Sequence, residues 1–307
     1  MTKSPQQKMQ RYLSVWQDEG PEMGLRVLSA KMRWAVLQKK YNKGLYRHHV
    51  KALDKPMYID LGDDGLSKTL YYRGVHEPPV TQWVKKELDP EMTILDIGAN
   101  IGYYVLLESS VLNQNGSLYA IEPVPSTYAI LQKNIALNQL SNVTTYQYAV
   151  GSTPGEAMIE VTEKRNWSHI THSNLSAKRA NLISQATYQS VPVPMTTVDL
   201  FVQEQQIENI NFMRMDVEGF ETEIIKGAIH TLTNHRPLKI FMEVHPFFAK
   251  DPTPFAEMVS TIYSCGLHAK FIGHYTGEAI YQPTQEEVIN FLFRKDFKEA
   301  PHLLFES

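Results

Sequence analysis

The sequence predicts an α/β protein whose main domain contains a doubly wound, mostly parallel sheet. Short apolar segments with strand character recur along the chain, and helix-like segments separate most of them. A glycine-containing turn follows the first strand of this alternation. The chain has 307 residues, 43% of them hydrophobic, which is enough for one large core. Such an alternation is typical of consecutive βαβ units.

The predicted strands of this sheet span residues 93–97, 117–121, 143–150, 211–215 and 239–244. A helix over residues 81–88 precedes them. Upstream, the segments MYIDL and TLYYRG flank Gly62-Asp63-Asp64-Gly65, and this pattern predicts a hairpin. The alternation is interrupted over residues 151–195, a Ser/Thr/Asn-rich stretch that ends in VPVP, which is typical of an edge strand. We interpret this stretch as an insertion near the functional site, serving as a lid or substrate region.

Residues 1–55 are expected to form a basic helical extension, and residues 56–307 the main domain. The extension contains 12 Lys and Arg but 4 Asp and Glu, a net charge of +8, whereas the remainder carries −11. Leu25, Leu28, Met32 and Val36 fall at helical spacing and form an apolar stripe. We expect this stripe to dock on the protein's own core or on a second copy in a homo-oligomer. The alternative is contact of residues 1–50 with an anionic membrane surface or an acidic partner.

Composition excludes several classes of protein. No segment approaches the roughly 18 consecutive apolar residues of a membrane-spanning helix. Cys265 is the single cysteine and the first residues lack an apolar run, so we expect a cytoplasmic protein, with membrane association left open. The acidic main domain argues against nucleic acid as a partner.

The segment LDIGANIGYY predicts a nucleotide-like ligand at a turn between a strand and a helix. Glycines at 98 and 102 let the backbone approach a ligand closely. Asp96 would repel a pyrophosphate but suits an ammonium group. At the end of the next strand Glu122, followed by Pro123, is placed to accept hydrogen bonds from both hydroxyls of a ribose. A ribose and an ammonium group without phosphate describe S-adenosylmethionine.

These motifs resemble, in order, those of the FkbM-type family of S-adenosylmethionine-dependent methyltransferases. The resemblance rests on LDIGANIGYY, AIEPVP, LQKNIALN, QYAVG, MTTVDLF, MDVEGFETEIIKGA, MEVHP and HLLFE, and it covers about residues 57–307. It implies a Rossmann-like, seven-stranded sheet with an antiparallel last strand. It also implies O-methylation of a hydroxyl on a sugar, glycan, glycolipid or other small-molecule natural product. The sequence departs from the family at Arg214, where a lysine is usual.

The resemblance further implies a set of cofactor contacts. It places Asp96, Gly98, Asn100, Gly102 and Tyr103 at the methionine end, Glu122 at the ribose, and the backbone near Ala149 against adenine. Ala99 and Pro123, from the same motifs, complete the expected cofactor-binding set. Glu77 is expected to contact either the cofactor or the substrate, with a turn residue as the alternative.

Four side chains follow two neighbouring predicted strands and are expected to converge on the acceptor: Asp216, Glu218, Glu243 and His245. Glu221 is interpreted as a helix cap. His245 is the first candidate for a general base, because an ordinary histidine accepts protons near neutrality. The alternative is that Asp216, Glu243 and His245 hold a divalent cation, Mg²⁺, Ca²⁺ or Mn²⁺, that acidifies the acceptor hydroxyl.

Two other functions remain as alternatives to methyl transfer. An NAD(P)-dependent Rossmann oxidoreductase would use a similar sheet, but Asp96 and the missing third glycine oppose it. A non-catalytic binding protein on the same scaffold would not need all four polar groups after the two strands. The sequence names neither the acceptor nor the oligomeric state.

Overall fold

The computed structural model describes residues 21–162, 169–170, 188–246, 251, 253–274, 279–294 and 300–307. The chain divides into two compact units, the first ending at His76 and the second spanning Glu77–Ser307. This division lies later than the expected boundary at residue 55. The reason is that residue 55 begins a strand, β2 (Lys55–Asp60), which pairs antiparallel with β1 (Leu45–Val50). A boundary there would separate the two strands of one hairpin.

In the first unit, the hairpin predicted around residues 62–65 is wrong, because TLYYRG lies in a helix, α3 (Leu66–Arg73). Leu66 and Leu70 are four residues apart and both are buried, as on one face of a helix. The Asp63 carboxylate accepts hydrogen bonds from the backbone N–H groups of Gly65 and Ser67 at 2.7 and 2.8 Å. These bonds satisfy N–H groups at the start of the helix and favour it over a strand.

The long helix α2 (Pro21–Lys40) buries a different face from the predicted one. Ala30 and Trp34 are buried, and the Trp34 ring lies 5.1 Å from that of Tyr71 in α3. Met32 and Val36 are instead 63% and 65% exposed, so docking of the stripe on the protein's own core is wrong for these two residues. Among the described helices, none has the length and apolar character needed to cross a membrane. Contact of residues 1–50 with a membrane or an acidic partner, and the expected compartment, stay predictions.

The second unit is built on an eight-stranded sheet. Its strands are β3 (Thr93–Ile97), β4 (Ser117–Ile121), β5 (Val143–Tyr146), β10 (Phe212–Met215), β11 (Lys239–Glu243), β12 (His268–Gly273), β13 (Ala279–Tyr281) and β14 (His302–Glu306). They lie in the order β13-β12-β14-β11-β10-β3-β4-β5. Strands β5, β4, β3, β10 and β11 are mutually parallel, and β14 is antiparallel to both of its neighbours. The predicted fold class and the antiparallel last strand are confirmed, and β13 adds an eighth strand to the expected seven.

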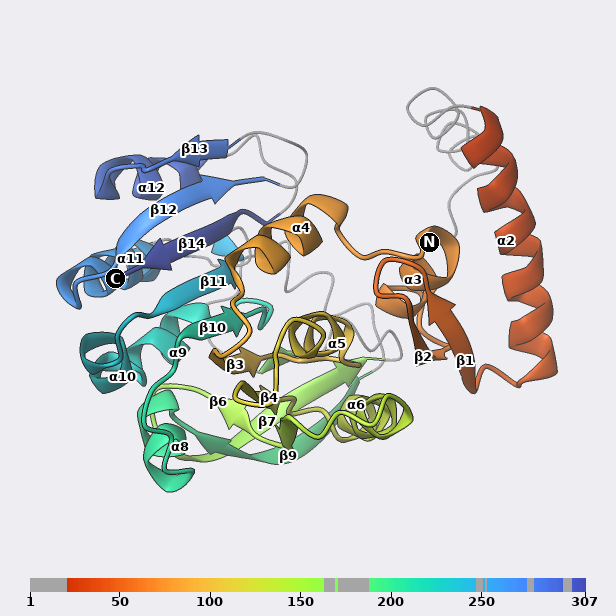
Figure 1. Cartoon of the computed structure of the whole chain (residues 1–307), viewed down its shortest axis with the longest axis horizontal. Coiled ribbons are helices and arrows are strands. Elements are labelled where there is room, and N and C mark those ends of the chain that lie inside the picture. The colour runs from red at the N-terminus through yellow and green to blue at the C-terminus, as the bar shows by residue number, and fades with distance from the viewer. Residues whose placement is uncertain are drawn as a thin grey trace. The chain divides into compact units, whose positions relative to one another are not determined.

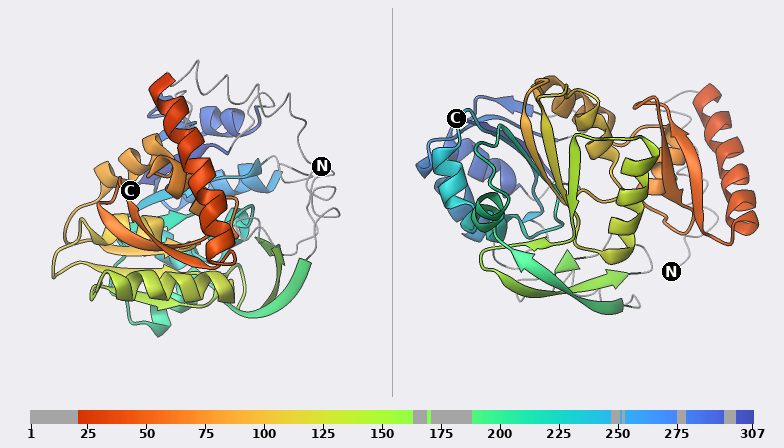
Figure 2. Two further views of the ribbon diagram at one scale, coloured as in Figure 1. Left: turned by 90° about the vertical axis from the view of Figure 1, so that its right-hand side faces the viewer. Right: turned by 60° about the horizontal axis from the view of Figure 1, so that its bottom comes forward.

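Helices cover both faces of this sheet (Figures 1 and 2). One face carries α4 (Pro78–Glu87), α5 (Tyr103–Ser109) and α6 (Pro125–Leu137). The other carries α8 (Val198–Glu204), α9 (Glu221–Lys226), α10 (Ile229–Asn234), α11 (Thr253–Ser264) and α12 (Gln285–Leu292). The strand order changes direction at β3. The chain continues from β3 to β4 and β5 on one side of it, whereas β10 and β11, which come later in the chain, lie on the other side. In open α/β sheets, ligands bind outside the carboxyl ends of the strands at this point.

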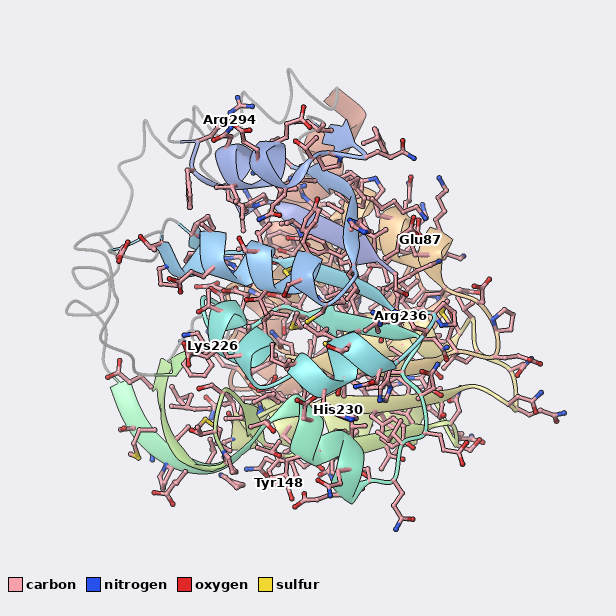
Figure 3. All side chains as sticks on the ribbon, turned by 90° about the vertical axis from the view of Figure 1, so that its left-hand side faces the viewer. Glu87, Tyr148, Lys226, His230, Arg236 and Arg294 are labelled. Carbon is pink, nitrogen blue, oxygen red and sulfur yellow. The ribbon has the colours of Figure 1, made fainter. Side chains whose placement is uncertain are left out.

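Polar contacts tie the periphery of the sheet together on the side shown in Figure 3. Glu87, at the end of α4, forms ion pairs with Lys239 of β11 and Lys270 of β12. Its Oε2 lies 3.0 and 2.9 Å from their Nζ atoms. Arg236 donates to the carbonyls of Leu232 and Cys265, which joins the ends of α10 and α11. These contacts lie away from the carboxyl ends of the central strands, and they connect the sheet with the helices that pack on it.

A second sheet of four strands contains the described parts of the predicted insertion. Its order is β6-β9-β7-β8, with β6 (Ala149–Val150), β7 (Gly155–Thr162), β8 (His169–Ile170) and β9 (Tyr188–Thr196). The VPVP segment lies in β9, which is an inner strand of this sheet only at Met195 and Thr196; among the described residues VPVP itself pairs only with β7, as expected for an edge segment. Because β9 pairs with β6 only at Met195 and Thr196, Pro192 and Pro194 lie beyond that contact and interrupt no pairing with it. Residues 163–168 and 171–187 lie outside the described residues, so the lid role stays a prediction.

Candidate active site

The predicted glycine turn joins β3 to α5. Gly98 and Gly102 have φ angles of +86° and +92°, which residues with a Cβ rarely adopt. A Cβ on Gly98 would also overlap the backbone carbonyl oxygen of Asp216. The Gly98 and Ala99 N–H groups both donate to the Ile121 carbonyl, at 2.9 and 3.0 Å. The turn therefore lies directly against the end of β10 and is held in place by β4.

Replacing Gly98 with alanine is expected to lower the free energy of unfolding by at least about 2 kcal/mol, because backbone strain and steric overlap act together. Urea denaturation followed by circular dichroism measures this change. Gly155→Ala is the matched control, since a Cβ there meets nothing within 4 Å. Equal stabilities of the two variants would contradict the close approach of the turn to Asp216.

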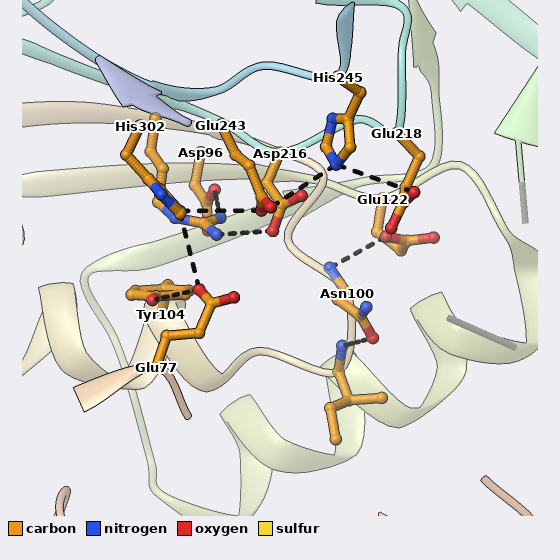
Figure 4. A network of polar contacts seen from close by, with 12 residues as sticks. Glu77, Asp96, Asn100, Tyr104, Glu122, Asp216, Glu218, Glu243, His245 and His302 are labelled. Atoms are coloured by element: carbon orange, nitrogen blue, oxygen red, sulfur yellow. Dashed lines mark hydrogen bonds and ion pairs between the residues drawn. The ribbon is translucent and has the colours of Figure 1, made fainter. Parts of the chain in front are cut away.

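Glu122 follows β4 and binds the same turn from the other side (Figure 4). Its Oε2 accepts a hydrogen bond from the Asn100 N–H and its Oε1 accepts one from the Val124 N–H, both at 2.9 Å. Burial raises the pKa of this carboxyl to about 7, although the two N–H donors oppose the rise. Glu122 therefore shapes the turn and changes charge near neutral pH. Its predicted contact with a ribose stays a prediction.

The other expected cofactor residues surround this turn. Asn100 has a φ of +51°, and its side chain accepts a hydrogen bond from the Ile101 N–H. Tyr103 begins α5 with its hydroxyl 3.1 Å from that of Thr81. Ala149 is buried in β6, and Pro123 is partly buried directly after Glu122. Asn100 and Tyr103 therefore belong to the turn and the helix that follows it, and Pro123 follows the glutamate that binds the turn, whereas Ala149 lies in a strand of the second sheet.

Asp96 has a different environment from the one expected. It lies opposite Arg214 in the register of β3 and β10, and its Oδ1 accepts a hydrogen bond from Arg214 Nη1 at 2.9 Å. The side chain is fully buried, and its Oδ2 has no hydrogen-bond partner among the residues that the structure describes. Burial raises the pKa of Asp96, against the effect of Arg214. The expected direct contact with a ligand ammonium is therefore not supported, since Asp96 faces Arg214 instead.

Arg214 links Asp96 to the acceptor side of the site. Its Nη2 donates to Asp216 Oδ2 at 3.0 Å, and its guanidinium carbon lies 3.8 Å from the centre of the Tyr104 ring. Burial disfavours its charge, but Asp96 and Asp216 outweigh this effect and raise its pKa. Arg214 is therefore a permanent cation that binds two carboxylates. This role does not require a side chain that can lose its proton.

His245 lies just beyond β11 and is held by Glu221. The His245 Nδ1 donates to Glu221 Oε1 at 2.7 Å, and the same oxygen accepts the Gly219 N–H at 3.0 Å. Glu221 thus lies in the first turn of α9 and accepts a backbone N–H there, as the helix-end interpretation requires, but its buried carboxylate also orients a histidine 24 residues away, which the sequence did not indicate. Burial lowers the pKa of His245, but Glu221, Glu243 and Glu218 together raise it to about 10.

His302 is a site residue that the sequence analysis missed. It begins β14 opposite Glu243 in the strand register, and its Nε2 lies 3.9 Å from both Glu77 Oε2 and Glu243 Oε2. Burial lowers its pKa to about 3. Glu77 precedes α4, and its Oε2 accepts a hydrogen bond from the Tyr104 hydroxyl at 3.5 Å. The only available signal was the family-like ending HLLFE, which does not indicate what His302 contacts.

The predicted acceptor residues do converge at the carboxyl ends of the parallel strands (Figure 4). Among the described residues, ligand atoms of Asp216, Glu243 and His245 lie within 4.8 Å of one another, as the cation alternative requires. Glu218 Oε2 lies 3.9 Å from His245 Nε2. A second set with the same spacing consists of Glu77, Glu243 and His302. The strand ends therefore carry a concentrated, partly buried group of carboxylates and imidazoles.

Comparison with known protein families shows which family this chain belongs to. The family described as the Methyltransferase FkbM domain matches residues 96–268, more than half of the chain. The chain belongs to the FkbM methyltransferase family. The family of protein-L-isoaspartate(D-aspartate) O-methyltransferases also matches residues 36–152, which include the glycine turn and Glu122. The FkbM match extends over both halves of the site, from Asp96 to His245, but not to His302.

Curated relatives of this FkbM protein are distant. "Methyltransferase 1" of Beauveria bassiana is 26% identical over 147 residues, 44% of this chain and 57% of that protein. The hexuronic acid methyltransferase AglP of Haloferax volcanii is 24% identical over 184 residues, 60% of this chain and 68% of AglP. The match thus spans a little over half to two thirds of the relatives' own length. Among solved structures, Aeropyrum pernix fibrillarin with bound S-adenosyl-L-methionine aligns with a TM-score of 0.40 at 12% identity, over 75% of this chain and 74% of that chain.

Proposed function

We propose that this protein is an S-adenosylmethionine-dependent methyltransferase that methylates a hydroxyl of a sugar, a glycan or another small molecule. The observation that carries the proposal is the position of Glu122 and the glycine turn, which lie at the sheet's switch point beside the carboxylate and histidine group. The glycine turn with Glu122 suits a nucleoside without phosphate. The group of carboxylates and histidines suits activation of a hydroxyl. The hexuronic acid substrate in AglP's name supports a sugar as acceptor.

The chain's own residues place the two reactants. S-adenosylmethionine supplies a methyl group on a sulfonium, and transfer requires the acceptor oxygen in line with the sulfur–carbon bond. Glu122 accepts the ribose hydroxyls, and the turn held by Ile121 presents its backbone to the methionine end. The acceptor hydroxyl is placed at Asp216, Glu218 and Glu243, whose oxygens can accept its proton in a hydrogen bond.

The acceptor proton can be removed by His245 as a general base or with the help of a divalent cation, and the pKa of His245 bears on the choice between these two routes. With a pKa of about 10 the imidazole is protonated at neutral pH, which argues against His245 as a general base there. The cation alternative fits better, because histidine ligands usually donate their second N–H to a carboxylate, as His245 does to Glu221. A divalent cation held by Asp216, Glu243 and His245 would supply a positive charge that lowers the pKa of the acceptor hydroxyl. His245 as the base remains the alternative.

Calorimetric titration tests the cofactor. We expect S-adenosylhomocysteine to bind and NAD not to bind, because the turn lacks the third glycine of the dinucleotide-binding fingerprint. Transfer of a radiolabelled methyl group to hexuronic acids and other sugars, with and without EDTA, then tests the reaction. Loss of turnover in EDTA with unchanged S-adenosylhomocysteine affinity supports the cation route. Binding of NAD alone would instead indicate an oxidoreductase, and cofactor binding with no transfer would favour a binding protein.

A further inference from the structure

The two oxygens of Glu243 face two different histidines. Oε1 lies 3.6 Å from His245 Nε2, and Oε2 lies 3.9 Å from His302 Nε2. Both separations exceed the usual hydrogen-bond length of about 2.7–3.2 Å. Glu243 therefore lies between the two imidazoles without a direct hydrogen bond to either, and each gap is of the size that a shared ligand atom or ion occupies.

A further carboxylate approaches the same ring nitrogen, Nε2, of each histidine. Glu218 Oε2 lies 3.9 Å from His245 Nε2, and Glu77 Oε2 lies 3.9 Å from His302 Nε2. The arrangement around Glu243 is thus nearly symmetrical, with one imidazole and an additional carboxylate at each oxygen. Only the side that contains His245 was expected from the sequence.

His302 itself indicates that something binds on its side. Its side chain is 2% exposed, its buried Nδ1 has no hydrogen-bond partner among the described residues, and its Nε2 lies 3.9 Å from the carboxylate oxygens of Glu77 and Glu243. Its Nε2 points into the space bounded by Glu77 and Glu243 (Figure 4). Because neither carboxylate lies within hydrogen-bond distance of Nε2, this nitrogen is placed to bind a ligand between them, as buried ring nitrogens normally have a partner.

The three side chains come from rigid elements that fix their positions. Glu77 directly precedes α4, Glu243 ends β11, and His302 begins β14 in register with Glu243. The imidazole lies near the rings of Trp83 and Phe241, with centroids 6.3 and 5.8 Å away. These apolar rings restrict its orientation, and the hydroxyl of Tyr104 orients Glu77. Such preorganisation is typical of a binding site.

We propose that Glu77, Glu243 and His302 bind a divalent cation, and that Glu243 bridges it to the cation position formed by Asp216, Glu243 and His245. Two carboxylates and one imidazole form a donor set suited to Mn²⁺, Fe²⁺ or Zn²⁺. Two cations that share one carboxylate lie about 3.5–4 Å apart, close enough to bind both an acceptor hydroxyl and a neighbouring oxygen of a sugar.

Manganese binding to the full chain tests this proposal without cofactor or acceptor, so its outcome is independent of methyl transfer. Equilibrium dialysis with Mn²⁺ is expected to give two equivalents per chain, and electron paramagnetic resonance a signal from two exchange-coupled ions. Glu77→Gln and His302→Gln are each expected to lower the count to one equivalent and to remove the coupling. Glu286→Gln, an exposed position in α12, is the matched control and should leave both unchanged.

Three results would overturn the bridged pair: one equivalent or none in the wild type, two equivalents without coupling, or two coupled equivalents that persist in both variants. Circular dichroism establishes that each variant is folded. If His302→Gln does not fold, Glu77→Gln decides the matter, because the Glu77 side chain is partly exposed at the start of a helix.

Discussion

Replacing Arg214 with methionine is expected to destabilise the protein by about 3–5 kcal/mol, the usual cost of removing one partner from a buried ion pair. Methionine fills much of the same volume but leaves Asp96 fully buried with no charged partner at Oδ1. Glu108 adds to this cost, because it is also fully buried, interacts electrostatically with Asp96, and has two oxygens without a hydrogen-bond partner in the described part of the chain. Urea denaturation at pH 7 measures the difference between the variant and the wild type.

The same variant should show a characteristic dependence on pH. Burial raises the pKa of Asp96, and without Arg214 nothing opposes that rise. The folded variant then binds a proton that the unfolded chain releases above its ordinary pKa, so its stability falls as pH rises from about 4 towards 7. The deficit relative to the wild type should therefore be smaller at pH 4.5 than at pH 7. Adding Asp96→Asn should recover part of it, and Arg214→Lys should lose less than Arg214→Met. A loss below 1 kcal/mol for Arg214→Met would contradict the role assigned to this residue.

Replacing Glu122 with alanine is expected to weaken S-adenosylhomocysteine binding by about 2 kcal/mol or more, roughly 30-fold, since charge-assisted hydrogen bonds to both ribose hydroxyls are lost. In the wild type the affinity should rise as pH rises through 7, because burial raises the Glu122 pKa to about 7 and the ionised form is the better acceptor. Calorimetry at pH 6, 7 and 8 measures both effects.

Two further variants separate the ribose contact from the support that Glu122 gives to the turn. Glu122→Gln keeps a carbonyl acceptor but does not ionise, so the pH dependence should disappear while part of the affinity remains. Glu156→Ala, at an exposed position in β7, is the control and should bind as the wild type does. If Glu122→Ala binds with unchanged affinity, Glu122 does not hold the ribose.

Sequence reasoning succeeded where the chemistry was local. The positions of the glycine turn at Gly98 and of the carboxylate of Glu122 after a strand were predicted correctly, because each lies within a few residues of the elements that explain it, while their contacts with a cofactor stay predictions. It failed where partners meet only through strand register, as Arg214 does with Asp96, 118 residues away. The contact of Glu221 with His245 was missed for the same reason, and so was the contact of His302 with Glu243. These residues become neighbours only once β10, β11 and β14 are aligned. The hairpin error at residues 62–74 has another cause, because apolar residues two apart in TLYYRG also fit a helix capped by Asp63.

The place of β14 between β11 and β12 affects how the sheet opens. Within the described sheet, β12 and β13 are connected by backbone hydrogen bonds to the other strands only through β14. If β14 detaches transiently, those two strands lose their ladder to the sheet at the same moment, and β11 gains an unpaired edge. Amide hydrogens of β12 that bond to β14 should therefore exchange with solvent in one cooperative event, at rates that match those of β14. His302 leaves Glu243 in that event, so amide exchange in β14 reports directly on how firmly this side of the site is assembled.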